Sequence, residues 1–242
     1  EDENELVSPD FSAVKNFKLG LPEEYFGVGM EGYMADALKT VQKQLEDLGI
    51  KFTPISLPHT KYALSTYYII QPAEVSANLA RYDGIRYEGA MPAEYLPEDL
   101  REIYLQSRGR GLGAEVKRRI ILGTFVLSSG YHDAYYKKAQ QVRALISQDF
   151  EKAFQKVDAI FAPVTPHFAF KFGEKISDPL SMYLEDAYTL PVNIAGLPGI
   201  SIPARVETKL PIGFQLIGKR FRESDILGIG RLYEKEVPPP SL

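Results

Sequence analysis

Few side chains in this 242-residue sequence are of a type and spacing that could do chemistry. The three histidines, His59, His132 and His167, match no metal-ligand spacing, so we interpret each as a hydrogen-bonding residue and expect no metal site. No Gly-x-Ser-x-Gly, Walker or dinucleotide-binding motif occurs, so a common serine-hydrolase elbow and a phosphate-binding loop are unsupported. The absence of cysteine excludes disulfides, thiolate metal sites and a cysteine nucleophile.

Two charged features could still belong to a site. The segment 105–119 is rich in arginine, lysine and glycine, which suits a phosphate-cradling loop or a nucleic-acid patch. No strand precedes it and its glycines fit no fingerprint, so a solvated basic turn leading into a helix is the favoured interpretation. Asp186 lies just before a mostly apolar, proline-punctuated segment, where a carboxylate needs a partner. Helix capping is the simplest role for it.

Composition describes the class of protein. An apolar fraction of 45% and a charged fraction of 25% are typical of soluble globular proteins. A net charge of −4 offers no general electrostatic reason to bind nucleic acid or an anionic membrane. No stretch has the roughly 18 uninterrupted apolar residues of a membrane-spanning helix, and the N-terminal Glu-Asp-Glu-Asn-Glu is unlike a signal peptide. We therefore expect a cytoplasmic protein that makes no membrane contact.

The elements that must position these residues are read from apolar periodicity. Strand patterns are expected at 17–21, 50–57, 158–162, 199–204 and 211–217. Helical patterns are expected at 30–48, 60–81, 131–157 and 224–235, with a break or kink at Pro72 and another helix starting at Pro97. Residues 167–182 are expected to form a loop. Strand, helix and strand within the first part of the chain indicate an α/β fold.

Two stretches carry a resemblance to a known family. They are Pro-Val-Asn-Ile-Ala-Gly-Leu-Pro-Gly-Ile-Ser-Ile-Pro, followed by Pro-Ile-Gly-Phe-Gln-Leu-Ile-Gly, and the run from Tyr67 to Gly84. Both resemble the amidase-signature family, and within it the glutaminase (A) subunits of tRNA-dependent glutamyl/aspartyl amidotransferases. The similarity runs from about Phe17 to Glu234 but corresponds only to the C-terminal half of a family member.

The resemblance implies the amidase-signature fold, an α/β architecture with a mixed β-sheet flanked by helices. Residues 17–236 would be the C-terminal portion of a single amidase-signature domain. Residues 1–16 would be a linker or cut end, and residues 237–242 a proline-rich tail. All five expected strands would then share one sheet, flanked by the helices at 30–48 and 131–157. Half of such a sheet would leave a strand edge or apolar surface that favours association.

The resemblance also implies chemistry that this sequence holds only in part. Amidase-signature enzymes use a serine nucleophile, a second serine in a cis peptide and an upstream lysine base, with the serines near a Gly-Gly-Ser-Ser-Gly-Gly-type segment. Ser128-Ser129-Gly130 is only superficially similar, because we expect it in a helical context without preceding glycines. We therefore expect no catalytic residue in this chain, and no amide hydrolysis by the chain alone.

Where this sequence matches motifs of the family, the resemblance implies three glutamine-binding residues: Tyr67, Arg119 and Asp186. A guanidinium that can fork onto the α-carboxylate of glutamine and a carboxylate that faces its α-ammonium suit this zwitterion. Each residue has a simpler alternative role: Tyr67 as a packed aromatic, Arg119 as a solvated helix residue, and Asp186 as a helix cap. Arg118, the neighbour of Arg119, also fits the arginine position of the motif. If the assignment holds, Arg119 and Asp186 should face one pocket.

The whole enzyme implied by the resemblance releases ammonia from glutamine through an acyl-enzyme. Ammonia would pass to the B subunit of the amidotransferase, where ATP and Mg²⁺ activate Glu-tRNA(Gln) or Asp-tRNA(Asn), while a small C subunit braces the pair. This chain would bind no cofactor itself, and its other partner would be the missing N-terminal half of the A subunit. A fragment of a stand-alone amidase for neutral amides, which needs no Arg119 and Asp186 pair, is one alternative. A non-catalytic binding or assembly module is the other.

Overall fold

The computed structural model describes residues 14–26, 30–87, 97–175 and 178–239. The chain divides into two compact units. The first contains Glu1–Leu64 and Val142–Leu242, and the second contains Ser65–Gln141. Of the expected linker at 1–16 only 14–16 are described, and of the expected tail at 237–242 only 237–239. No described helix is both long enough and apolar enough to cross a membrane.

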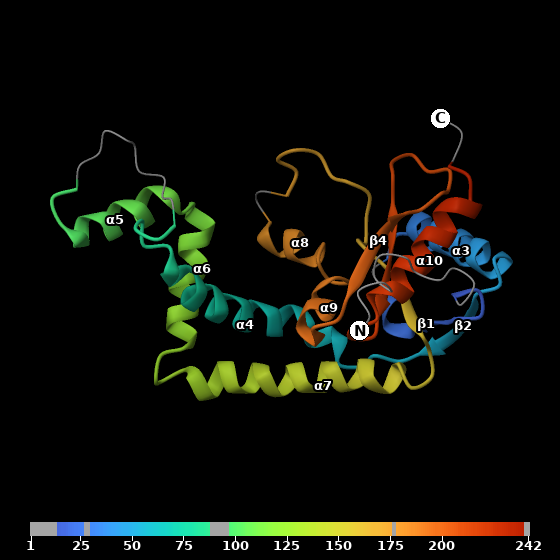
Figure 1. Cartoon of the computed structure of the whole chain (residues 1–242), viewed down its shortest axis with the longest axis horizontal. Helices are drawn as coiled ribbons and strands as arrows, with labels where there is room; N and C mark the ends of the chain where they lie inside the picture. Colours follow the sequence, from blue (N-terminus) through green and yellow to red (C-terminus); the bar gives the residue numbers. More distant parts are fainter. Residues whose placement is uncertain (1–13, 27–29, 88–96, 176–177, 240–242) are drawn as a thin grey trace. The chain divides into compact units, whose positions relative to one another are not determined.

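The first unit is built on a five-stranded mixed sheet (Figure 1). Its strands are β1 (Lys18–Pro22), β2 (Lys51–Ile55), β3 (Ala159–Pro163), β4 (Gly199–Pro203) and β5 (Gly213–Gly218), in the order β2-β1-β3-β5-β4. The β1 strand is parallel to β2 and β3, and β5 is antiparallel to β3 and β4. The five strands expected from the sequence therefore do share one mixed sheet. Pro54 is tolerated because β2 lies at an edge.

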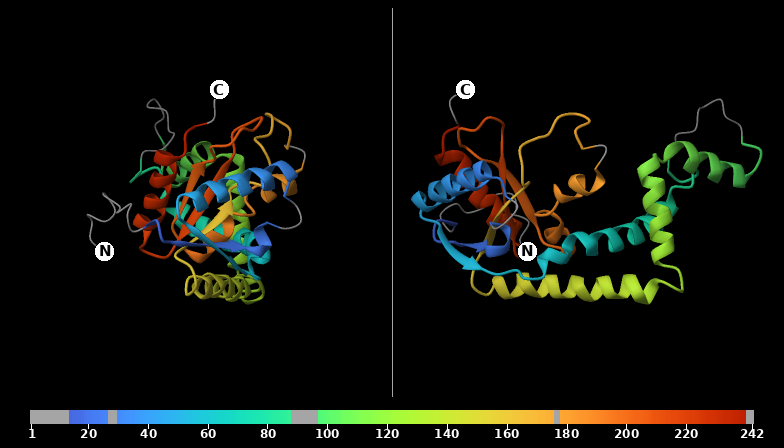
Figure 2. Two further views of the ribbon diagram at one scale, coloured as in Figure 1. Left: turned by 90° about the vertical axis from the view of Figure 1, so that its right-hand side faces the viewer. Right: turned by 180° about the vertical axis from the view of Figure 1, so that it is seen from behind.

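One face of the sheet packs against α3 (Gly32–Asp47) and α10 (Glu223–Glu236) (Figure 2). The helical spacing seen in the sequence puts Leu38, Val41 and Leu45 of α3 into this core, where they are almost completely buried. Phe214 of β5 packs edge-on against Tyr233 of α10, with ring centroids 5.1 Å apart. Apolar residues on one helical stripe thus cover apolar residues on one strand face.

Further helices of the first unit are most of α7 (Lys138–Ala153), α8 (Pro179–Leu184) and α9 (Leu190–Ala195). Arg143 of α7 donates from Nε to the Ile194 carbonyl of α9 at 3.0 Å. The expected loop at 167–182 is wrong at its end, since α8 begins at Pro179. The Asp178 carboxylate accepts a hydrogen bond from the Ser181 amide, and proline suits the first helical turn. Short 3-10 turns lie at Glu23–Tyr25 and Thr60–Tyr62.

The second unit is helical in its described part. It contains most of α4 (Ala63–Asn78), a 3-10 turn (Leu79–Arg81), α5 (Leu100–Gly111), α6 (Ala114–Val126) and a π-helix (His132–Lys137) that leads into α7. Of the break or kink expected at Pro72, the break is wrong, because α4 continues through it, and the kink stays a prediction. The helix expected from Pro97 starts at Leu100 instead, where Asp99 is the N-cap and accepts from the Glu102 amide at 2.7 Å.

Two further expectations need correction. The helix expected at 131–157 starts as a π-helix and ends at Ala153, so its first turn has a different hydrogen-bond pattern from the rest. Ser128-Ser129-Gly130 lies in the turn after α6 and not in a helix.

Candidate functional site

Tyr67 and Arg119 lie together where α4 and α6 pack in the second unit. The Arg119 guanidinium donates from Nη1 to the side-chain oxygen of Gln71 at 3.0 Å, and the Tyr67 hydroxyl accepts another hydrogen bond from it. The guanidinium carbon lies 5.8 Å from the centroid of the Tyr68 ring. Three side chains of one α4 segment therefore orient this cation. Tyr67 and Arg119 are therefore in contact, while their role in binding glutamine stays a prediction.

The close crossing of α4 and α6 depends on Gly123, one turn after Arg119. A Cβ atom at Gly123 would lie 1.9 Å from the Pro72 carbonyl oxygen and 2.9 Å from the Ser76 hydroxyl. Glycine is disfavoured inside a helix by about 1 kcal/mol relative to alanine. Here it lets the two backbones touch, which brings Arg119 onto the Tyr67–Gln71 turn. Sequence reasoning missed this position.

Glu115, one turn before Arg119 on α6, is the carboxylate of the cluster. Its Oε1 accepts from Arg119 Nε at 2.8 Å and from Arg118 Nη2 at 2.7 Å, and its Oε2 accepts from Arg118 Nε at 2.8 Å. These hydrogen bonds, first from Arg119 and then from Arg118, hold the pKa of Glu115 below its ordinary value. Sequence reasoning missed Glu115, although its i,i+3 and i,i+4 spacing to the arginines is a recognisable signal.

The two adjacent arginines differ in burial. The Arg118 side chain is 54% exposed, whereas that of Arg119 is 24% exposed. Burial by itself lowers the pKa of Arg119, but its hydrogen bonds to Glu115 and Tyr67 outweigh this effect and raise the pKa above its ordinary value. Arg119 is therefore a charged, pre-oriented guanidinium. Between the two candidates, the contact with Tyr67 favours Arg119.

Asp186 lies in the first unit, in the turn between α8 and α9. Its backbone carbonyl accepts from the amides of Thr189 at 3.1 Å and Leu190 at 3.0 Å, and the residue is exposed. The N-cap of α9 is Thr189, so the capping interpretation of Asp186 is wrong. Because Tyr67 and Arg119 belong to the second unit, the common pocket expected for the three residues stays a prediction.

The residue before Asp186 is part of a largely buried ion pair. Lys175 Nζ contacts the Glu185 carboxylate, and the two side chains are 15% and 12% exposed. Lys175 Nζ also lies 4.7 Å from the centroid of the Phe170 ring. The pair ties the segment before α8 to the turn that carries Asp186. No sequence signal distinguished these two residues from the other charged residues of the loop.

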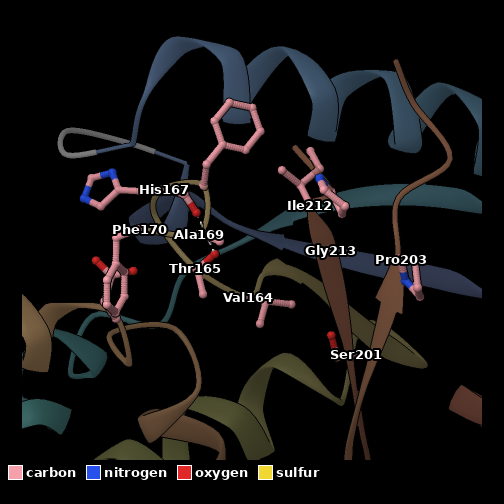
Figure 3. A pocket seen from close by; sticks show the side chains of 12 residues that line it. Val164, Thr165, His167, Ala169, Phe170, Ser201, Pro203, Ile212 and Gly213 are labelled. Atoms are coloured by element: carbon pink, nitrogen blue, oxygen red, sulfur yellow. Dashed lines mark hydrogen bonds between the residues drawn. The ribbon is translucent and has the colours of Figure 1, made fainter. Parts of the chain in front are cut away.

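A cavity of about 480 Å³ lies beside the β4–β5 hairpin in the first unit (Figure 3). His167 and Phe170 stand on one side of it, and Pro203 and Ile212 on the other. Its wall is mainly apolar. The Thr165 hydroxyl donates to the His167 carbonyl at 3.0 Å. This cavity suits an apolar group, and the geometry gives it no evident chemistry.

Each histidine lies next to a carboxylate. Nδ1 of His59 is 3.0 Å from both carboxylate oxygens of the buried Asp149, and that carboxylate also accepts from the His59 amide at 2.8 Å. His132 is 2.9 Å from Asp133, and His167 is 3.9 Å from Glu31. Over the ranges that the structure describes, no group of three or more histidine, aspartate or glutamate side chains is placed to hold a metal ion.

The comparison with known proteins agrees with the sheet and the helices described above. A family model described as Amidase matches residues 1–227. This chain belongs to the amidase family. The resemblance expected from the motif at 191–203 is therefore confirmed, and the amidase fold is confirmed by solved structures. A crystal structure of the glutamyl-tRNA(Gln) amidotransferase A subunit from Thermotoga maritima matches with a TM-score of 0.68 and 38% identity, over 93% of this chain and 43% of that one.

Curated amidase relatives are more similar in sequence. The glutamyl-tRNA(Gln) amidotransferase A subunit of Myxococcus xanthus is 53% identical over 234 residues, which is 94% of this chain and 48% of that protein. The protein of the same name from Carboxydothermus hydrogenoformans is 54% identical over 92% of this chain and 45% of its own length. The chain thus spans about half the length of the relatives it matches. A crystal structure of an amidase at 19% identity, with a TM-score of 0.68, shares the fold.

Proposed function

We propose that this chain is the C-terminal, glutamine-recognising part of the glutaminase (A) subunit of a tRNA-dependent amidotransferase. Relatives that are 53 and 54% identical over more than nine tenths of the chain carry the name of that subunit. The observation that carries the proposal is the Arg119 guanidinium, partly buried and oriented by Tyr67 and Gln71. A planar cation held in this way suits the α-carboxylate of a free amino acid.

Each proposed binding residue has a separate role. Arg119 forks onto the α-carboxylate of glutamine, Tyr67 orients Arg119 through its hydroxyl, and Asp186 faces the α-ammonium. The Tyr67–Arg119 hydrogen bond supports the role of Tyr67, and the exposed position of Asp186 supports the role of that carboxylate. The side-chain amide would then be presented to the catalytic serine of the other half.

The reaction needs catalytic residues and an ATP site that we assign to partner proteins. A catalytic half that carries the Ser-Ser-Lys machinery would attack the glutamine amide and release ammonia through an acyl-enzyme, so the isolated chain is inactive in this proposal. Among the described strands β4 pairs only with β5, which leaves an edge suited to pairing with that half. The B subunit would bind ATP and Mg²⁺ and amidate Glu-tRNA(Gln), the C subunit would complete a heterotrimer, and the assembly would act as a ligase in the cytoplasm.

The test uses this chain assembled with a catalytic half and with the B and C subunits. Arg119→Gln should lower kcat/KM for glutamine-dependent amidation roughly ten- to a hundredfold, since a charge-assisted hydrogen bond contributes about 1.5–3 kcal/mol. Ammonium chloride as nitrogen donor should support the variant as well as the parent, because ammonium does not need the carboxylate site. Arg101→Gln is the matched control, an exposed arginine on α5 of the same unit, and should change neither rate.

Other outcomes point to other functions. Equal loss with glutamine and ammonium would show that Arg119 is structural. Hydrolysis of neutral amides that is insensitive to Arg119→Gln would support the stand-alone amidase. An assembly with no glutaminase activity at all would support the remaining interpretation, a non-catalytic binding or assembly module.

A further inference from the structure

The guanidinium proposed to bind glutamine already has a carboxylate partner. Glu115 Oε1 lies 2.8 Å from Arg119 Nε. Nε belongs to the guanidinium edge that a carboxylate engages when it binds arginine in a bidentate manner. An incoming α-carboxylate that uses this edge must therefore displace Glu115.

Three contacts with α4 hold Arg119 in place independently of Glu115. They are the hydrogen bond to Gln71, the hydrogen bond to Tyr67 and the approach to the ring of Tyr68. The Glu115 side chain, by contrast, is 52% exposed and lies on the same helix as Arg119. Exposed ion pairs of this i,i+4 kind are weak, and a side chain near solvent can move aside. Glu115 is therefore a replaceable ligand of a fixed cation.

Arg118 gives Glu115 a second place to bind. It donates from both Nε and Nη2 to the two carboxylate oxygens, which is the bidentate geometry. When Glu115 leaves Arg119 it keeps this partner, so its displacement does not leave a charge without a counter-charge. Because the pKa of Glu115 lies below its ordinary value, the carboxylate stays charged at neutral pH and the competition persists there.

We propose that Glu115 competes with the α-carboxylate of the substrate for Arg119, and that Arg118 weakens this competition by holding the displaced Glu115. The inference rests on the proposed role of Arg119. It assigns to the EVKRR segment at 115–119 control over how tightly the amino acid binds, and not over the chemical step.

The experiment measures KM and kcat for glutamine hydrolysis by the assembled enzyme. Glu115→Gln should lower KM about two- to fivefold with kcat unchanged, the range that an exposed ion pair allows. Arg118→Gln should raise KM by a similar factor, because Glu115 then engages Arg119 alone. The double variant should behave like Glu115→Gln, since Arg118 acts only through that carboxylate. Glu74→Gln, the same charge change at an exposed position on α4, is the control and should leave KM unaltered.

The direction in which Glu115→Gln changes KM for glutamine decides whether Glu115 competes with the substrate. A higher or unchanged KM would overturn the inference, because Glu115 would then orient Arg119 or have no influence on it. An additive double variant would also overturn it, since Arg118 would then act on its own. If Arg119→Gln leaves KM for glutamine unchanged, the proposed function itself fails, so the two failures are distinguishable.

Discussion

Replacing Gly123 by alanine tests the helix crossing that positions Arg119. The added methyl would lie 1.9 Å from the Pro72 carbonyl oxygen, so the helices would have to separate by about 1.5 Å to reach ordinary contact. The obstacle is backbone, which cannot rotate away as a side chain can. Overpacking of this kind destabilises by about 1–3 kcal/mol, against about 1 kcal/mol gained from the higher helix propensity of alanine. We expect a net loss of up to about 2 kcal/mol.

Gly109→Ala is the matched control. Gly109 also lies inside a helix, α5, but a Cβ there would meet no atom within 4 Å. This variant should be stabilised by up to about 1 kcal/mol. Urea unfolding of the 242-residue chain, followed by circular dichroism at 222 nm, should therefore move the two midpoints in opposite directions. If Gly123→Ala were as stable as Gly109→Ala, the tight crossing at Pro72 would not exist as described.

Three other substitutions test separate contacts. Asp186→Ala should reduce glutamine-dependent amidation roughly ten- to a hundredfold while ammonium restores it, whereas equal impairment with both donors would show a structural role. Lys175→Met removes the cation from the largely buried Glu185 carboxylate and should lower the free energy of unfolding by about 1–3 kcal/mol in urea titrations; an unchanged midpoint would contradict the ion pair. Asp149→Asn weakens the hydrogen bonds to the amide and ring of His59 and should cost about 1.5–3 kcal/mol by the same method, and an unchanged midpoint would count against that contact.

Apolar spacing in the sequence was enough to place the sheet and its main helices. Leu38, Val41 and Leu45 recur at the helical period, and the five strand patterns coincide with observed strands to within one or two residues. Burial of one stripe or one face is a local property of the chain, so it leaves a periodic trace that can be recognised without the fold. The family resemblance added the arrangement of all five strands in one sheet and the choice of Tyr67 and Arg119.

Tertiary structure alone decided which groups of α4 surround Arg119. Arg118 and Arg119 are neighbours of identical chemistry, and only the packing of α6 on α4 buries one and exposes the other. The contact of Gly123 with Pro72 and the pairing of Lys175 with Glu185 likewise join residues whose separation in the chain follows no period. Such contacts depend on how two segments cross, which is set by the packing of many side chains together and leaves no mark on any single stretch of sequence.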